Sequence, residues 1–125
     1  MQVKVCGLTT AKQVETCISH GANFCGFILN YKKSHRFINY KTAEQLTNIK
    51  KQKTSFVGVL VNPSEEEFKI FSNLSLDYFQ IYGDYLGRNI KEIKNNYKKK
   101  IILSLQIKHE QDVLKYKIYK KVADI

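Results

Sequence analysis

The chain has few cysteines, prolines and arginines, and it contains no long apolar run. Its three cysteines, Cys6, Cys17 and Cys25, are an odd number without a C-x-x-C pair. This pattern favours neither a disulfide framework nor a zinc site, so we expect reduced thiols. We interpret Cys17 and Cys25 as small buried residues of a helix and a strand. Cys6 differs from them by its position.

Apolar runs are of strand length, as in residues 56–61 (FVGVLV), and a membrane helix needs about 20 such residues. The N-terminus has the pattern of a strand and not of a signal peptide. We therefore expect a cytoplasmic globular protein without a membrane partner. The only proline, Pro63, lies where a strand passes into a helix, and no linker follows it. Residues 1–125 are predicted to belong to a single domain.

Acidic residues are scarce: 11 Asp and Glu face 21 Lys and Arg, which gives a net charge of +10. This excess raises the question of a nucleic-acid partner. However, only Arg36 and Arg88 are arginines, the residue type best suited to bidentate recognition of bases and phosphates. We therefore interpret the lysines as a solvated surface and consider nucleic acid an unlikely partner. General attraction of anionic ligands is the alternative.

Strand-like apolar runs alternate with segments of helical spacing at a period of about 22 residues. They begin near Val3, Phe24, Phe56, Tyr78, Ile101 and Val122. Such alternation predicts a parallel sheet, because each helix carries the chain back to start the next strand in the same direction. Five units and the start of a sixth strand are somewhat more than half of a barrel of about 250 residues. We expect an α/β fold, a partial (β/α)8 TIM barrel truncated within its sixth strand; an open doubly wound sheet is the alternative.

Helix starts are marked by a Ser or Thr followed three residues later by Glu or Gln, the pattern of a capping box. It occurs at residues 10–13, 42–45 and 64–67. Gly21 is predicted to end the first helix in a left-handed conformation, with His20 beside it on the surface.

Residues 4–9 (KVCGLT) place the thiol of Cys6 where the first strand ends and a glycine opens the following loop. In a parallel barrel the C-terminal ends of the strands form the functional rim, so a reactive side chain there indicates chemistry. By strand alternation Lys4 lies on the same face as Cys6, with plain solvent contact as its alternative role.

Several stretches, in order and spacing, resemble phosphoribosylanthranilate isomerase across the whole chain. They are residues 4–9, 21–27 (GANFCGF), 34–38 (SHRFI), 58–62 (GVLVN) and 79–84 (FQIYGD). The resemblance implies the N-terminal portion of a TIM-barrel isomerase of tryptophan, and hence aromatic amino-acid, biosynthesis. Its substrate would be a small phosphosugar, N-(5-phosphoribosyl)anthranilate. An Amadori rearrangement without cofactor or metal would convert it to 1-(2-carboxyphenylamino)-1-deoxyribulose 5-phosphate.

The same resemblance implies roles for three residues. Cys6 would be the base that removes the C2 proton, and because a free thiol is only slightly ionised at neutral pH, the site must favour the thiolate. Arg36 would bind the anthranilate carboxylate through two parallel hydrogen bonds, with a loop salt bridge as the alternative. Gln80 would face the substrate or, equally, be a polar residue within the barrel.

The chain also departs from the family pattern. Tyr82 stands where many members have a histidine, and we interpret His35 and His109 as surface residues that do not replace it. The family's general acid is an aspartate at the end of the sixth strand, whereas Asp124 lies at that strand's beginning, where capping or solvent contact is expected.

The phosphate-binding loops of the seventh and eighth strands have no counterpart in this sequence. We therefore expect the chain to be inactive alone. The alternative function is a non-catalytic half-barrel that self-associates through its open sheet edges or complements a C-terminal fragment.

Overall fold

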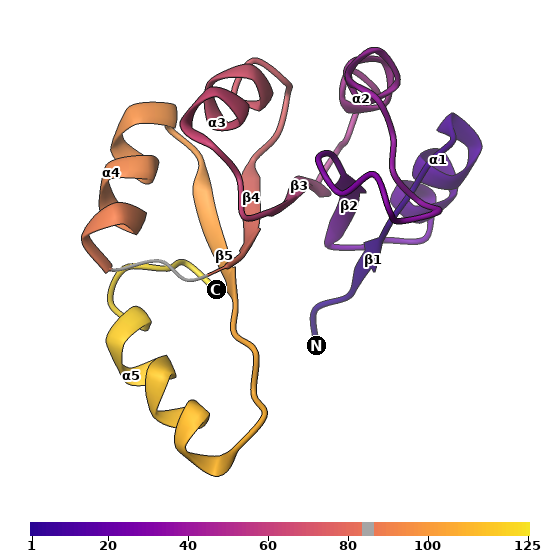
Figure 1. The fold of residues 1–125 in the computed structure, drawn as a ribbon. Coiled ribbons are helices and arrows are strands. Elements are labelled where there is room, and N and C mark those ends of the chain that lie inside the picture. Colours follow the sequence, from indigo (N-terminus) through magenta and orange to yellow (C-terminus); the bar gives the residue numbers. More distant parts are fainter. Residues whose placement is uncertain (84–86) are drawn as a thin grey trace.

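The computed structural model describes residues 1–83 and 87–125, in which five strands alternate with helices (Figure 1). None of the helices in these ranges has the length and apolar character needed to cross a membrane. The elements are β1 (Lys4–Cys6), α1 (Ala11–Ser19), β2 (Phe24–Ile28), α2 (Tyr40–Thr47), β3 (Ser55–Val61), α3 (Glu65–Phe71), β4 (Tyr78–Tyr82), α4 (Gly87–Tyr97), β5 (Lys100–Ser104), the 3-10 helix η1 (Glu110–Leu114) and α5 (Lys115–Tyr119).

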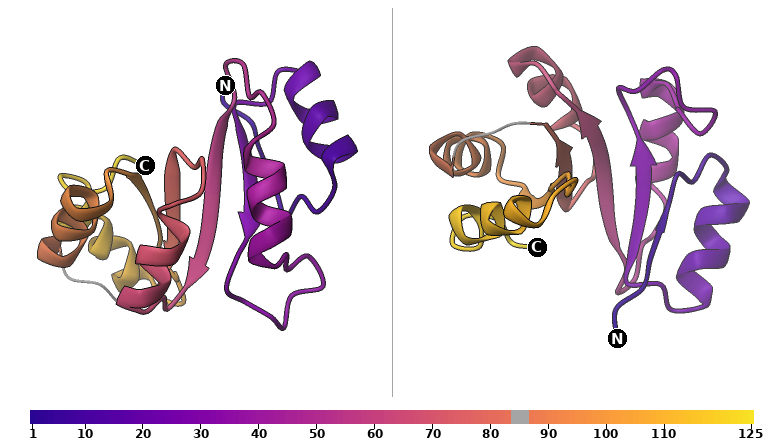
Figure 2. Two further views of the ribbon diagram at one scale, coloured as in Figure 1. Left: turned by 90° about the horizontal axis from the view of Figure 1, so that it is seen from above. Right: turned by 60° about the horizontal axis from the view of Figure 1, so that its bottom comes forward.

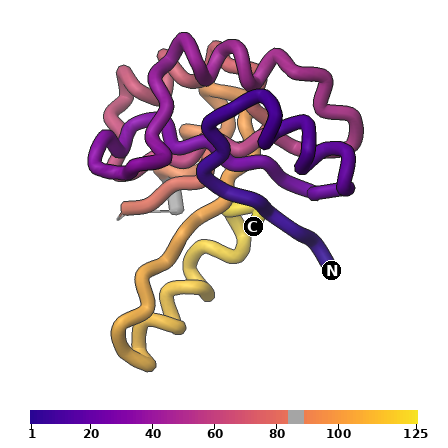
Figure 3. The backbone as a smooth tube through the Cα atoms, turned by 90° about the vertical axis from the view of Figure 1, so that its right-hand side faces the viewer, coloured from indigo at the N-terminus to yellow at the C-terminus, as the bar shows by residue number. Residues whose placement is uncertain are grey.

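The strands form one parallel sheet in the order β1-β2-β3-β4-β5. Helices α1 to α4 lie in an arc on one side of this sheet, and both chain ends lie on the other side (Figures 1 and 3). Figure 2 shows α1 and α2 beside one end of the sheet and α3 and α4 beside the other. A doubly wound sheet would reverse its strand order and carry helices on both faces. The fold is therefore the predicted partial (β/α)8 barrel.

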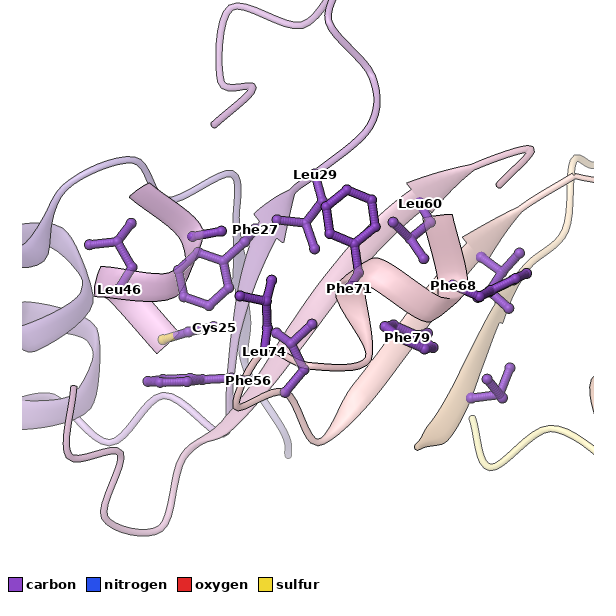
Figure 4. Close-up of a cluster of buried hydrophobic side chains, with 14 of the residues drawn as sticks. Cys25, Phe27, Leu29, Leu46, Phe56, Leu60, Phe68, Phe71, Leu74 and Phe79 are labelled. Atoms are coloured by element: carbon purple, nitrogen blue, oxygen red, sulfur yellow. The ribbon is translucent and has the colours of Figure 1, made fainter. Parts of the chain in front are cut away.

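The hydrophobic core lies between the helices and the convex face of the sheet (Figure 4). Alternate residues of β2, β3 and β4 point into it, and the rings of Phe27 and Phe56 meet edge to face at 5.5 Å. Each buried aromatic or aliphatic side chain contributes about 1.5–3 kcal/mol. The labelled members of this core are Cys25, Phe27, Leu29, Leu46, Phe56, Leu60, Phe68, Phe71, Leu74 and Phe79.

The opposite, concave face carries the polar side chains of the predicted site. Parallel register pairs Cys6 with Gly26 and Val59 with Gln80, and paired residues point to the same side of a sheet. Lys4, two residues before Cys6, shares this face. The helix layer thus fixes a sheet whose C-terminal strand ends lie at one edge, and Cys6 and Gln80 both approach that edge.

Two of the three predicted capping boxes are confirmed, at Thr10 with Gln13 and at Ser64 with Glu67. The start predicted for the second helix is wrong. Helix α2 begins at Tyr40, because the side chain of Asn39 accepts a hydrogen bond from the Thr42 N–H and caps the helix three residues earlier. The left-handed conformation of Gly21 (φ +75°) is confirmed.

The predicted sixth strand is present only as a hydrogen-bonding pattern, because residues 122–125 form no strand element. The N–H groups of Asp124 and Ile125 donate to the Ile101 carbonyl at 2.8 and 3.2 Å, and Leu103 N–H donates to the Ile125 carbonyl at 3.0 Å. This is the pattern of parallel strands. The Asp124 carboxylate accepts from the Ile101 N–H at 2.8 Å and from Lys94 Nζ, which confirms the capping role predicted for it.

Candidate active site

Cys6 is the last residue of β1, and its surroundings are tied to β2 by the backbone. The N–H groups of Gly7 and Leu8 both donate to the Gly26 carbonyl, at 2.9 and 3.1 Å. The Arg36 guanidinium reaches the same point, since its Nη1 donates to the Cys6 carbonyl at 2.8 Å. The structure therefore brings together two of the three predicted site residues, which are 30 residues apart in the sequence.

Gly7 provides the space that the guanidinium occupies. Its φ is +79°, and a β carbon at this position would lie 2.7 Å from both Cδ and Nη1 of Arg36. Only glycine combines a left-handed backbone with such a close approach at little cost. The glycine of the KVCGLT segment thus makes room for the arginine against the Cys6 backbone.

Arg36 is held by the long connection between β2 and α2. Phe37 forms a bridge with Ile28, and the buried Ile38 donates its N–H to the Ile28 carbonyl at 3.1 Å. The Arg36 N–H donates to Ser34 Oγ at 3.2 Å. Within the described residues no ion pair joins the exposed Arg36 to a carboxylate, so its other guanidinium donors are available to a ligand.

The side chains of Lys4 and Cys6 both lie close to Gly26. The Cys6 Sγ and the Lys4 Nζ each lie 2.9 Å from the point where a β carbon of Gly26 would be, which confirms that the two side chains share a face. Sequence reasoning missed the importance of Gly26. The available signal was a glycine inside an apolar strand, which often marks a close approach of other groups.

Gln80 of β4 belongs to a small polar network. Its Nε2 donates to Ser104 Oγ at 2.9 Å and to the Tyr82 hydroxyl at 3.2 Å. Its Oε1 is buried and has no hydrogen-bond partner in the described parts of the chain. The Tyr82 hydroxyl and Ser104 therefore orient the Gln80 amide, and Ser104 is a contributor that sequence reasoning missed. Its signal was a polar residue at the end of a strand.

Cys6 and Gln80 are not in contact. They lie on β1 and β4, separated by three strand spacings of about 4.8 Å each, or about 14 Å along the sheet. A cavity of about 430 Å³ lies beyond the ends of β3 to β5 and includes Tyr82, Ser104 and the exposed His109. A second, of about 630 Å³, runs along β1 and α1 and includes Cys6. A ligand must therefore bridge the two residues if both bind it.

Cys25 is unsuited to catalysis. Cys25 is fully buried, and burial, with the neighbouring Cys17 adding to it, raises the pKa of its thiol to about 12. Cys25 therefore packs as predicted, while Cys17 is half-buried on α1. No cluster of three or more His, Cys, Asp or Glu side chains able to hold a metal occurs within residues 1–83 and 87–125. Asp84, the last residue of the FQIYGD segment, lies outside the described residues.

Fold and site together define a partial (β/α)8-barrel protein with a thiol, a guanidinium and an oriented amide at the C-terminal strand ends. The family described as N-(5'-phosphoribosyl)anthranilate (PRA) isomerase matches residues 3–125, and the chain belongs to this family. The resemblance noted in the sequence is thereby confirmed.

Among relatives, the N-(5'-phosphoribosyl)anthranilate isomerase of Streptococcus mutans is 33% identical over 114 residues, covering 90% of this chain and 56% of the relative. That of Sulfurihydrogenibium sp. is 31% identical over 120 residues, covering 96% of the chain and again 56% of the relative. The chain thus spans a little over half the length of these curated relatives.

Solved structures share the fold. Phosphoribosyl anthranilate isomerase in complex with reduced 1-(o-carboxyphenylamino)-1-deoxyribulose 5-phosphate superposes with a TM-score of 0.87 at 24% identity, over 97% of this chain and 61% of that one. The Thermotoga maritima enzyme gives a TM-score of 0.86 at 24% identity, over 97% and 58%.

Proposed function

We propose that this chain supplies the base and the carboxylate-binding group of a phosphoribosylanthranilate isomerase. One observation carries the proposal: the Arg36 guanidinium donates a hydrogen bond of 2.8 Å to the backbone carbonyl of Cys6, the residue that bears the candidate base. The ligand of the related structure, reduced 1-(o-carboxyphenylamino)-1-deoxyribulose 5-phosphate, has both a carboxylate and a phosphate. A small phosphosugar with an aromatic carboxylate is the matching substrate.

In the proposed reaction an acid protonates the ring oxygen of the ribose, and the sugar opens to a Schiff base. The Cys6 thiolate then takes the C2 proton, which gives an enolamine that tautomerises to the ketone. No net oxidation occurs and no cofactor is consumed. Arg36 holds the anthranilate carboxylate so that C2 lies within reach of the thiolate.

Gln80 is proposed to contact the same substrate from the other side of the concave face. Its Nε2 is occupied by Ser104 and Tyr82, which leaves the buried Oε1 to accept a hydrogen bond from a substrate hydroxyl or N–H. The substrate would thereby satisfy an otherwise unpaired acceptor, an interaction worth about 1–3 kcal/mol.

The acid is proposed to lie outside the described residues. Asp124 does not fit the role, because its carboxylate is engaged with Lys94 and with the N–H of Ile101 near the beginning of β5, at the edge of the sheet opposite the rim. The phosphate-binding loops belong, by the same proposal, to the part of the relatives' length that this chain does not match.

Several expectations remain predictions. They are the cytoplasmic location, the membership of residues 1–125 in one domain, the absence of a nucleic-acid partner, and self-association through the open sheet edges. The last is the alternative function: a half-barrel that acts by pairing with another copy or with a C-terminal fragment.

Binding and turnover can be tested separately. The chain contains no tryptophan, so the fluorescence of anthranilate reports its binding without interference. We expect Arg36→Lys to weaken binding about tenfold, because one bidentate charged contact is lost, while Lys41→Met on α2 leaves it unchanged. Equal binding by Arg36→Lys and the unchanged chain would contradict the carboxylate role.

Turnover is expected only when the chain is mixed with the C-terminal part of a relative such as the Streptococcus mutans enzyme. Cys6→Ala is then expected to abolish it, whereas Cys17→Ala retains it. Activity that survives Cys6→Ala would reject Cys6 as the base, and Cys6-dependent turnover by the chain alone would reject its predicted inactivity.

A further inference from the structure

The long connection after β2 begins with a side chain that pairs like a strand residue. Asn30 is half-buried, and its amide binds both backbone groups of Val61 at the end of β3. Its Oδ1 accepts from the Val61 N–H at 2.8 Å, and its Nδ2 donates to the Val61 carbonyl at 3.0 Å. A neighbouring backbone normally satisfies such groups. The amide of Asn30 therefore extends the contact between β2 and β3 beyond Ile28, the last residue of β2.

The same amide is tied to helix α3. Asn30 Nδ2 also donates to Glu67 Oε2 at 3.3 Å, and this oxygen accepts from the Ser64 N–H at 2.9 Å in the capping box of the helix. An asparagine amide has an acceptor oxygen and a nitrogen that carries two protons, so one side chain can make all three contacts. It thus joins the connection to a strand end and to a helix start, 31 and 37 residues further along the chain.

Hydrogen bonds continue from Asn30 to Arg36. The Tyr31 carbonyl accepts from the Ser34 N–H at 3.0 Å, and Ser34 Oγ accepts from the Arg36 N–H at 3.2 Å. We call residues 31–36 the Arg36 segment. Apart from the half-buried Ser34 its residues are exposed, so little packing of its own holds it. The conformation of such a segment depends on the residues that anchor its two ends.

One end of the Arg36 segment is fixed by the bridge between Phe37 and Ile28. We propose that Asn30 anchors the other end and is thereby a positioning residue, which keeps the Arg36 guanidinium on the Cys6 carbonyl. Without this anchor the connection stays bound at Phe37, while the segment before it opens more often. The role of Arg36 toward a ligand carboxylate rests on the proposed function. The anchoring of the segment does not, since it can be measured without a ligand.

Limited trypsin digestion measures the opening of the Arg36 segment, because the protease cleaves after Lys32, Lys33 and Arg36. At low protease concentration the cleavage rate follows the population of the open form. Asn30→Asp keeps the shape of the side chain, removes its donor and places a carboxylate against Glu67. We expect this variant of the 125-residue chain to be cleaved within the segment about tenfold faster, relative to cleavage within helices α1 and α4, as measured by peptide mass spectrometry.

Two further variants test the specificity of this effect. Asn73→Asp is the matched control, since it makes the same change of charge and also removes an amide donor, in this case to the Lys69 carbonyl at 3.3 Å. It is expected to leave the cleavage ratio unchanged. Glu67→Gln alone is expected to change little, because its side chain keeps an acceptor oxygen for Asn30. Combined with Asn30→Asp, it removes the repulsion between two carboxylates and is expected to restore part of the protection.

Anthranilate fluorescence measures the consequence for Arg36. Asn30→Asp is expected to weaken anthranilate binding about threefold, less than Arg36→Lys does, because the guanidinium is still present but is less often in place. Asn73→Asp is expected to bind as the unchanged chain does. The double variant with Asn30→Asp and Glu67→Gln is expected to recover part of the affinity, which a general loss of stability would not produce.

An unchanged cleavage ratio in Asn30→Asp, or an equal change in Asn73→Asp, would overturn the inference. Faster cleavage with unchanged binding would also overturn it where Arg36→Lys weakens binding, because Asn30 would then order the segment without positioning the guanidinium. If Arg36→Lys itself leaves binding unchanged, the carboxylate role in the proposed function fails. The cleavage ratio then still decides whether Asn30 anchors the segment.

Discussion

Two glycines with the same backbone conformation differ in what surrounds them. Gly7 (φ +79°) lies under Arg36, whereas around Gly21 (φ +75°) a β carbon would meet nothing within 4 Å. A left-handed conformation costs an alanine about 1–2 kcal/mol at either position. Only at Gly7 would an added β carbon also displace a neighbouring side chain. Comparing alanine substitutions at the two glycines therefore distinguishes the cost of backbone strain from the cost of displacing Arg36.

We therefore predict that Gly7→Ala lowers the free energy of unfolding more than Gly21→Ala, by about a further 1 kcal/mol for the displaced guanidinium. Urea unfolding of both variants measures the difference. Anthranilate binding is expected to weaken in Gly7→Ala alone. Equal losses of stability with unchanged binding in both variants would show that Gly7 does not seat Arg36.

At the scale of elements, one device recurs at the entry to alternate strands. An Asn or Asp that precedes a strand forms two hydrogen bonds with one residue of the preceding strand, or of the segment just before that strand. Its side-chain oxygen accepts from the backbone N–H of that partner at 2.7–2.8 Å, and its own backbone N–H donates to the partner's carbonyl. The pairs are Asn23 with Val3, Asp77 with Phe56, and Asp124 with Ile101. Each pair sets the register at the edge opposite the site.

Asp77 allows this device to be tested. Its carboxylate accepts from the Phe56 N–H at 2.7 Å and pairs with Lys51 at 2.8 Å. Asp77→Ala is predicted to lower the free energy of unfolding by about 1–3 kcal/mol, because the N–H of a buried residue loses its partner. Asp77→Asn keeps one acceptor and is expected to cost less. Denaturant unfolding of both variants checks the order, and equal losses would assign the effect to the ion pair with Lys51.

Asp124 makes the same interaction dependent on pH. Burial acts to raise the pKa of its carboxyl, but hydrogen bonds from the Ile101 N–H and Lys94 outweigh burial and lower the pKa overall. A lowered folded-state pKa stabilises the fold above the unfolded-state value of about 3.9, and this contribution is lost as the pH falls through the folded-state value. We predict that the difference in free energy of unfolding between the unchanged chain and its Asp124→Asn variant becomes smaller below about pH 4. Thermal melts from pH 6 to 3 measure it, and a constant difference would contradict the prediction.

For the whole molecule, the sheet of the described residues leaves β1 paired on one side only, and the segment that follows β5 exposes apolar side chains. These include Ile107, Val113, Leu114, Tyr116 and Ile118. An open strand edge and exposed apolar side chains favour association. We predict that the 125-residue chain sediments as a concentration-dependent mixture, and that adding the C-terminal part of a relative shifts it to a defined complex. A monomer at all concentrations with a cooperative melt would contradict this.

Features that depend on neighbours in sequence were determined by the sequence itself. The alternation of strands and helices, the capping boxes at Thr10 and Ser64 and the place of Cys6 at a strand end all follow from patterns a few residues long. The start of α2 was mistaken because two capping candidates compete there. The contact of Phe37 with Ile28, a tertiary feature, pins the connection just before Asn39, the residue that caps the helix.

Only the tertiary structure decided the sequential strand order and hence the barrel-like curvature of the sheet. It also decided the contact of Arg36 with Gly7, the approach of Lys4 and Cys6 to Gly26, and the partners of Gln80. These contacts join residues on different strands or loops, so they depend on parallel register and on the packing that fixes it. The sequence places a thiol at the end of a strand, and the fold decides which side chains surround it.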